Sequence, residues 1–218
     1  MIRKIDAMNS MNLKQIPGYN YNEYLLVLSP HEALQDKIMQ VKKEFSEKYK
    51  ATVALYSKPQ IPLVNFIQFE MMEARLVNRL KSIATSCHSF KVDLKDYSSF
   101  PSHTIFINVA SKQQVQNLGK ELKTAQQLMT INKENKPHFM ENFSITVARK
   151  LLPWQYEKGW LDYRNSHFTG CFIADGMLLL KRKLRSDGDR QTGNYQPVQR
   201  FEFMNLPVKT QQGDLFTQ

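Results

Sequence analysis

The sequence predicts an α+β fold of two similar lobes, each a mainly antiparallel sheet with helices on its outer face, around a central cleft. Segment 142–148 alternates apolar and polar residues with a period of two, which is typical of a half-buried strand. An apolar segment, 61–69, lies about 80 residues earlier, and similar elements flank it. The order strand–helix–strand–helix–strand therefore occurs twice, which indicates a duplicated architecture.

The composition is compatible with one domain that buries a substantial core. The chain has 218 residues, 42% of them hydrophobic. We expect a single bilobal domain over residues 21–206, an N-terminal arm over 1–20 and a flexible tail over 207–218. The start has no apolar region typical of a signal peptide, and no segment has the ~18 apolar residues of a membrane span.

The cysteine content favours a reduced compartment and no metal. Cys87 and Cys171 are the only cysteines and lie far apart, and the sequence lacks paired Cys/His spacing for zinc. We therefore expect a cytoplasmic protein with no membrane contact, no metal and no cofactor.

The net charge of +10 favours polyanionic partners such as RNA or a nucleotide. The alternative is a surplus of lysines on solvated helix faces. The cluster Lys181-Arg182-Lys183 shows the same ambiguity. It could bind a nucleic-acid backbone, but alternation along a strand would place Arg182 on the face opposite its two neighbours.

The first half begins with a short apolar strand and an amphipathic helix. Ser29-Pro30-His31-Glu32 predicts a capping box in which the Ser29 hydroxyl caps the helix and Glu32 reaches back. The expected elements are a strand at 24–28, a helix to 48, a possible short strand at 52–55, a strand at 61–69, a helix at 72–85 and a strand at 90–94.

The second half repeats this order and then adds two closing strands. The segment between the closing strands, 185–194, is a long polar hairpin loop and a candidate binding lid. The expected elements are strands at 104–109 and 142–148, a helix that begins near 111, a helix at 153–163, and strands at 168–173, 176–184 and 198–206.

Two matched positions on the central strands are the candidate site. When Leu63 is aligned with Ser144, Asn65 falls against Thr146. A strand residue and its second neighbour share a face, so each pair would point into the same cleft.

These matched strands and the order of elements resemble the 2H phosphoesterase superfamily over about residues 21–206, most of all its LigT-like, or 2'-5' RNA ligase-like, branch. The resemblance implies a His-x-Thr/Ser motif in each lobe. One histidine would act as general base and the other as general acid on a 2',3'-cyclic phosphate or a 2'-5' linkage. The Thr or Ser hydroxyls would hold the phosphate.

Both histidine positions differ from that pattern, since Leu63 stands at the first and Ser144 at the second. Proton transfer by one such group contributes about 10²–10⁴-fold to the rate, so losing both predicts a degenerate active site with no confident catalytic residue. Asn65, Ser144 and Thr146 can still donate hydrogen bonds to an anion, and His103, at the start of a strand, is a further candidate ligand contact.

The sequence leaves three functions open. The first is a degenerate 2H phosphoesterase-like protein that binds a phosphate-bearing ligand, such as an RNA end or a nucleotide. The second is an active cyclic phosphodiesterase or 2'-5' RNA ligase-like enzyme with a relocated histidine, His103 or His138. His138 lies six residues before Ser144, about 20 Å along an extended strand, so the chain would have to fold back. The third is a protein–protein scaffold. Neither the ligand nor the oligomeric state follows from the sequence.

Overall fold

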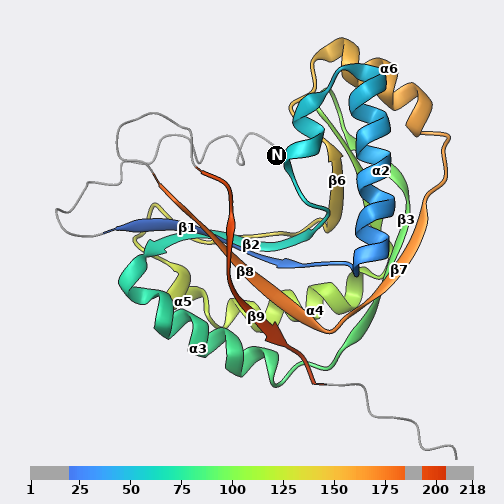
Figure 1. Cartoon of the computed structure of the whole chain (residues 1–218). Helices are drawn as coiled ribbons and strands as arrows, with labels where there is room; N and C mark the ends of the chain where they lie inside the picture. The colour runs from blue at the N-terminus through green and yellow to red at the C-terminus, as the bar shows by residue number, and fades with distance from the viewer. Residues whose placement is uncertain (1–19, 185–192, 205–218) are drawn as a thin grey trace, which may run out of the picture.

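The structure is a computed structural model that describes residues 20–184 and 193–204, and its strands form two antiparallel sheets (Figure 1). The first sheet has the strand order β5-β2-β1-β8-β9 and the second has the order β6-β4-β3-β7. The strands of the first sheet are β1 (Tyr21–Leu28), β2 (Ile61–Phe69), β5 (His138–Phe139), β8 (Gly176–Lys183) and β9 (Gln196–Glu202). Those of the second are β3 (Phe90–Phe100), β4 (Thr104–Val109), β6 (Ser144–Ala148) and β7 (Thr169–Ala174).

Two helices each pack on the side of the molecule opposite to the sheet that contains the preceding strand. Helix α2 (Glu32–Tyr49) follows β1 of the first sheet but packs against β6 and β7 of the second, beside α6 (Pro153–Tyr163). Helix α4 (Lys112–Lys123) follows β4 of the second sheet but contacts α3 (Glu73–Ala84) beneath the first (Figure 1). The predicted fold class is confirmed, but a lobe in space is not one half of the sequence. The short helix α5 (Gln126–Met129) and the 3-10 helices η2 (Thr52–Tyr56) and η3 (Glu70–Met72) complete the described elements.

Helix α2 forms because apolar residues recur along one face. Leu34, Ile38 and Phe45 are buried, and the helix ends at Lys50, which adopts a left-handed conformation with φ 53°. The predicted capping box was wrong. The helix begins two residues later than a Ser29 cap requires, and His31 is the N-cap, since its Nδ1 accepts a hydrogen bond from the Leu34 amide at 3.3 Å.

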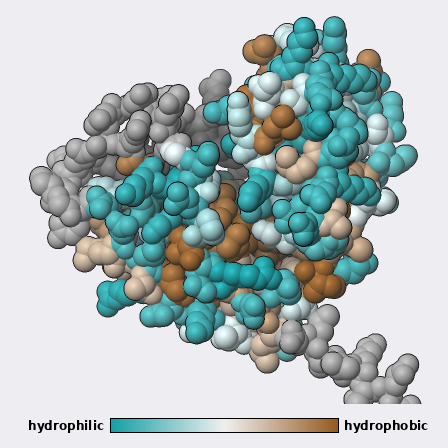
Figure 2. All heavy atoms as spheres, viewed as in Figure 1, coloured by the Kyte–Doolittle hydropathy of each residue, from teal (hydrophilic) through white to brown (hydrophobic). Residues whose placement is uncertain are grey.

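One hydrophobic core joins both sheets. It contains Val64 and Phe66 from β2 and Ile105 and Ile107 from β4. A glycine allows α6 to lie close to α2, because a Cβ atom at Gly159 would be 2.8 Å from the Phe45 ring. Hydrophilic residues cover most of the face in Figure 2, and hydrophobic residues are exposed there in separate patches.

Most predicted elements are present, and the differences are local. The possible strand at 52–55 is wrong, since these residues lie in the 3-10 helix η2. Strand β3 extends to Phe100, well beyond the predicted 94, and β9 begins at Gln196 and ends at Glu202. Three predicted segments lie outside the described residues: residues 1–19 of the arm, residues 185–192 of the candidate lid, and the tail. In the described ranges, no helix is long and apolar enough to cross a membrane.

Candidate functional site

The two faces of β2 have different environments. Directly opposed residues of antiparallel strands point to the same face, and Phe66 is opposed to Tyr24 of β1, with which it stacks. The Tyr24 hydroxyl donates to Glu73 of α3 at 2.9 Å, so this face lies against the helices. Asn65 therefore points to the opposite face, away from α3. Leu63 lies at a register shift between β1 and β2 and has no directly opposed residue on β1.

Leu63 does not border an open groove. Its side chain is 2% exposed and belongs to the continuous hydrophobic core, against which Met140 also packs. The Met140 amide donates to the Leu63 carbonyl at 2.9 Å, so the chain around β5 runs along this part of β2. The expectation that Leu63 faces an open hollow was wrong. A leucine lacks polar atoms to keep it near water, and here it completes the core.

Asn65 lies in a polar cluster drawn from three strands and the residue before β9. Its Nδ2 donates to Glu23 Oε1 of β1 at 2.8 Å and to the hydroxyl oxygen of Tyr195 at 3.2 Å. Arg182 of β8 donates from Nε to Glu23 Oε2 at 2.6 Å, and its Nη2 forms an ion pair with the same oxygen at 2.5 Å. We call Glu23, Asn65, Arg182 and Tyr195 the Asn65 cluster.

The Asn65 cluster is neutral in sum and largely buried. The side chains of Glu23 and Arg182 are 12% and 28% exposed, and their charges compensate each other. Burial raises the pKa of Tyr195 well above its usual range, and the Glu23 carboxylate raises it further, so the phenol stays protonated. The Oδ1 of Asn65 is buried and has no hydrogen-bond partner among the described residues. The Nδ2 of Asn65 is thus occupied by contacts within the protein, and its Oδ1 is the acceptor that remains without a partner in the described part of the chain.

The second motif position is more open. On β6, Ile145 and Val147 are buried in the core, while Ser144 and Thr146 are half-exposed on the other face. Ser144 is opposed to Asn108 and Thr146 to Phe106. Neither hydroxyl makes a hydrogen bond with another described side chain or backbone group, so both can bind a ligand. Cα atoms of β2 and β6 approach within 8 Å, which brings the two motif strands close together.

The structure separates the two candidate histidines. His103 immediately precedes β4, and Thr146 is opposed to Phe106 of that strand. Phe106 is three residues after His103, so the backbones at His103 and Thr146 are about 10 Å apart along the strand direction. The Nδ1 of His103 lies 2.6 Å from the Thr104 hydroxyl. His103 therefore lies toward the far end of β6 from Ser144.

His138 lies beside the first motif position. It is directly opposed to Asn65 in the pairing of β5 with β2, so the two side chains share a face. The chain does fold back before β6, which the distance along an extended strand could not show. A two-residue strand such as β5 has too little periodicity to be recognised in a sequence.

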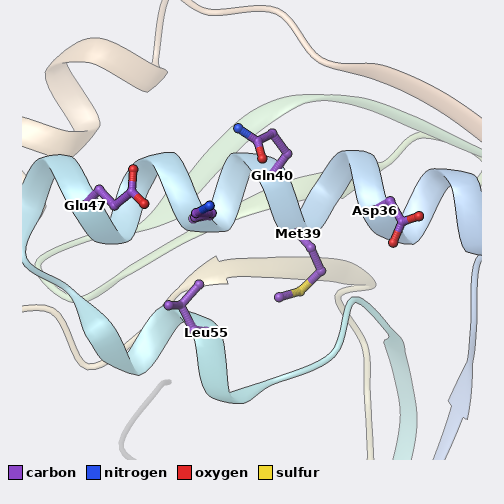
Figure 3. A pocket seen from close by; sticks show the side chains of 6 residues that line it. Asp36, Met39, Gln40, Glu47 and Leu55 are labelled. Carbon is purple, nitrogen blue, oxygen red and sulfur yellow. The ribbon is translucent and has the colours of Figure 1, made fainter.

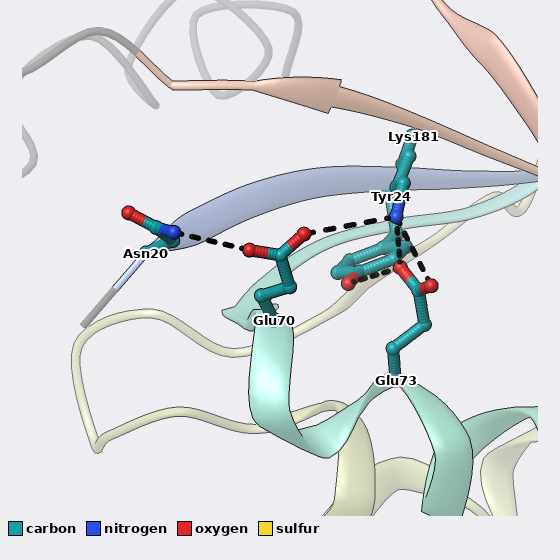
Figure 4. A network of polar contacts seen from close by, with 5 residues as sticks. All are labelled: Asn20, Tyr24, Glu70, Glu73 and Lys181. Atoms are coloured by element: carbon teal, nitrogen blue, oxygen red, sulfur yellow. Dashed lines mark hydrogen bonds and ion pairs between the residues drawn. The ribbon is translucent and has the colours of Figure 1, made fainter.

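The basic cluster on β8 is mostly paired. Lys181 and Arg182 point to opposite faces, as predicted, and each contacts acidic residues. The Nζ of Lys181 lies 3.0 and 2.8 Å from the carboxylate oxygens of Glu73 and 3.9 Å from Glu70 (Figure 4). These contacts leave Lys183 as the exposed base of the three, which is too little for a nucleic-acid groove on this strand.

A pocket lies away from the motif strands, on α2 and η2 (Figure 3). It has a volume of about 310 Å³, and none of the four motif residues lines it. Its lining residues are Asp36, Met39, Gln40, Lys43, Glu47 and Leu55. Within residues 20–184 and 193–204, no group of three or more potential ligands could hold a metal ion.

Comparison with solved structures gives clear matches over most of the chain. E. coli LigT complexed with 3'-AMP matches with a TM-score of 0.55 and 11% identity, over 84% of this chain and 98% of LigT. TT0787 of Thermus thermophilus matches with a TM-score of 0.54 and 13% identity, over 84% and 98%. E. coli LigT complexed with phosphate matches with a TM-score of 0.51 and 12% identity, over 85% and 99%. The chain has the LigT fold.

The predicted resemblance to 2H phosphoesterases is thus confirmed at the level of the fold. No protein-family model and no curated protein matches the sequence. Within the LigT fold, sequence reasoning identified the two motif strands but did not place Glu23 or Tyr195 beside Asn65. The pairing of Glu23 with Arg182 spans 159 residues of sequence and left no local signal.

Proposed function

We propose that this protein is a catalytically degenerate 2H phosphoesterase-like protein that binds a phosphate-bearing ligand, such as a nucleotide or an RNA end. The observation that carries the proposal is the pair of half-exposed hydroxyls of Ser144 and Thr146 on β6, which have no hydrogen-bond partner among the described residues. LigT structures with phosphate and with 3'-AMP support it, because they share this fold. The net charge of +10 favours an anionic ligand. His103 is a candidate contact for a part of the ligand beyond the phosphate.

The motif positions explain why turnover should be lost. Neither Leu63 nor Ser144 carries an imidazole, and no described base contacts the Ser144 hydroxyl. An unactivated hydroxyl is a poor acid or base near neutral pH. The residues that remain can orient a phosphate without exchanging protons with it.

Replacing both hydroxyls should weaken binding of 3'-AMP. A hydrogen bond to a charged group contributes about 1.5–3 kcal/mol, so Ser144→Ala/Thr146→Val should raise Kd at least about tenfold. Isothermal titration calorimetry at two salt concentrations would measure it, and affinity should fall as salt rises. Thr169→Val, at an exposed position on edge strand β7, is the matched control. Equal affinity of the double variant and the wild type would refute the phosphate site.

An active enzyme is the second candidate, and the position of His138 beside Asn65 favours it. One imidazole could supply one of the two proton transfers that the resemblance implies. We nevertheless expect no hydrolysis of 2',3'-cyclic AMP above the uncatalysed rate, since no described histidine contacts Ser144 to supply the second transfer.

Chromatographic detection of the nucleoside monophosphate product would test this, with His138→Ala and the exposed His167→Ala in parallel. Turnover that survives His167→Ala but disappears in His138→Ala would establish the enzyme instead of the binding protein.

A further inference from the structure

Tyr195 lies between Arg182 and Asn65, on the face of the first sheet opposite α3, and we call its place there the slot. The guanidinium carbon of Arg182 lies 4.4 Å from the centre of the Tyr195 ring, a stacking distance. At the ring edge, the Tyr195 hydroxyl oxygen accepts a hydrogen bond from Asn65 Nδ2 at 3.2 Å. The slot therefore holds a planar ring by its face and by one polar atom on its edge.

The Asn65 carboxamide at the end of this slot uses its Nδ2 to bind Tyr195, but Tyr195 gives no hydrogen bond to its Oδ1. Asn65 is 9% exposed, and its Oδ1 is buried without a partner among the described residues. A buried acceptor without a donor is unfavourable, and buried polar atoms in folded proteins nearly always have partners. A ring whose edge carries a donor next to an acceptor would satisfy both atoms of the carboxamide.

Nucleobases with an amino group match this arrangement. Asparagine forms two parallel hydrogen bonds with adenine, accepting from its amino group and donating to a ring nitrogen. Bases also stack on arginine guanidinium planes. The adjacent Glu23 carboxylate favours a second amino hydrogen and disfavours a carbonyl edge, because it repels oxygen lone pairs.

We infer that the slot between Arg182 and Asn65 is a binding site for an amino-bearing nucleobase, adenine above all, and that Tyr195 fills it when no ligand is bound. The inference rests on the proposed function, since it assigns the base of the ligand whose phosphate binds Ser144 and Thr146. A ligand must displace Tyr195, so the tyrosine competes with the base.

Removing the competitor should strengthen base binding selectively. Tyr195 contributes hydrogen bonds with Asn65 and Glu23 and one stacking contact with Arg182, so Tyr195→Ala should tighten adenosine binding about 5- to 10-fold. Affinity for ribose 5-phosphate, which has no base, should stay unchanged. Inosine, which has a carbonyl in place of the amino group, should gain less than adenosine. Calorimetric titration of all three probes into the wild type and Tyr195→Ala would measure these changes.

The two probes separate the slot from the phosphate site. Loss of ribose 5-phosphate binding in Ser144→Ala/Thr146→Val, with no effect of Tyr195→Ala on adenosine, overturns the base site and leaves the phosphate site standing. If Tyr195→Ala tightens adenosine binding but no variant binds ribose 5-phosphate, the base site stands and the phosphate site is overturned. If Tyr195→Ala fails to fold, Tyr195→Phe removes only the hydroxyl. It should still tighten adenosine about 2- to 5-fold, and an unchanged affinity overturns the inference.

Discussion

Replacement of Arg182 by methionine should destabilise the protein by about 3 kcal/mol. The Glu23 carboxylate is 12% exposed and receives a hydrogen bond and an ion-pair contact from Arg182. The variant therefore leaves a buried charge with Asn65 and Tyr195 as the neutral side chains that hydrogen-bond it. Breaking a buried pair by removing one partner typically costs about 3–5 kcal/mol, and the 28% exposure of Arg182 places this case at the lower end. Urea denaturation followed by far-UV circular dichroism would measure the free energy of unfolding.

The control and the double variant show whether the lost charge pairing is the cause. Lys183→Met changes an exposed base one position along the same strand and should alter stability by less than about 0.5 kcal/mol. Adding Glu23→Gln to Arg182→Met removes the unpaired charge and keeps an oxygen acceptor for Asn65, so it should recover more than half of the loss. A double variant no more stable than Arg182→Met would show that packing, not charge, sets the cost.

The sequence predicted most of the strands because strand patterns are local, but it did not predict how the strands pair or how the helices cover the sheets. Alternation identified β6, the match to β6 identified the apolar segment that forms β2, and α6 has the bounds expected from the proline that begins it. The exchange of α2 and α4 between the sheets depends on which distant apolar faces meet. A pattern read within one segment cannot contain that information.

In the candidate site, too, the sequence predicted what depends on a local pattern and did not predict what depends on distant neighbours. The alternation expected on β6 is regular, with Ser144 opposed to Asn108 and Thr146 to Phe106. On β2 the register with β1 shifts at Leu63, which a period of two in the sequence did not show. Burial depends on the neighbours, so the sequence did not show that Leu63 joins the core. It also did not show that His138 folds back beside Asn65, because β5 has only two residues.

Replacement of Lys42 by methionine should change how stability depends on pH. Lys42 is 0% exposed, and its Nζ donates to the Ser57 carbonyl at 2.5 Å and to the Ser57 hydroxyl at 2.9 Å. No described carboxylate forms an ion pair with it. Burial lowers the pKa of Lys42 to about 8, and the nearby positive charge of Arg149 contributes.

The sign of the effect follows from proton binding. Below pH 8 the lysine is charged in both the folded and the unfolded chain, and the folded state carries the cost of a buried charge. Between about pH 8 and 10.5 the unfolded chain still binds a proton that the folded protein has released, so wild-type stability rises with pH by roughly 3 kcal/mol from this group.

Lys42→Met lacks this rise. Its free energy of unfolding, relative to the wild type, should be highest at pH 7 and should fall steadily towards pH 10. Urea denaturation at several pH values, with the exposed neighbour Lys43→Met as control, would measure the difference. A constant difference between Lys42→Met and the wild type from pH 7 to 10 would mean that Lys42 keeps an ordinary affinity for its proton inside the fold.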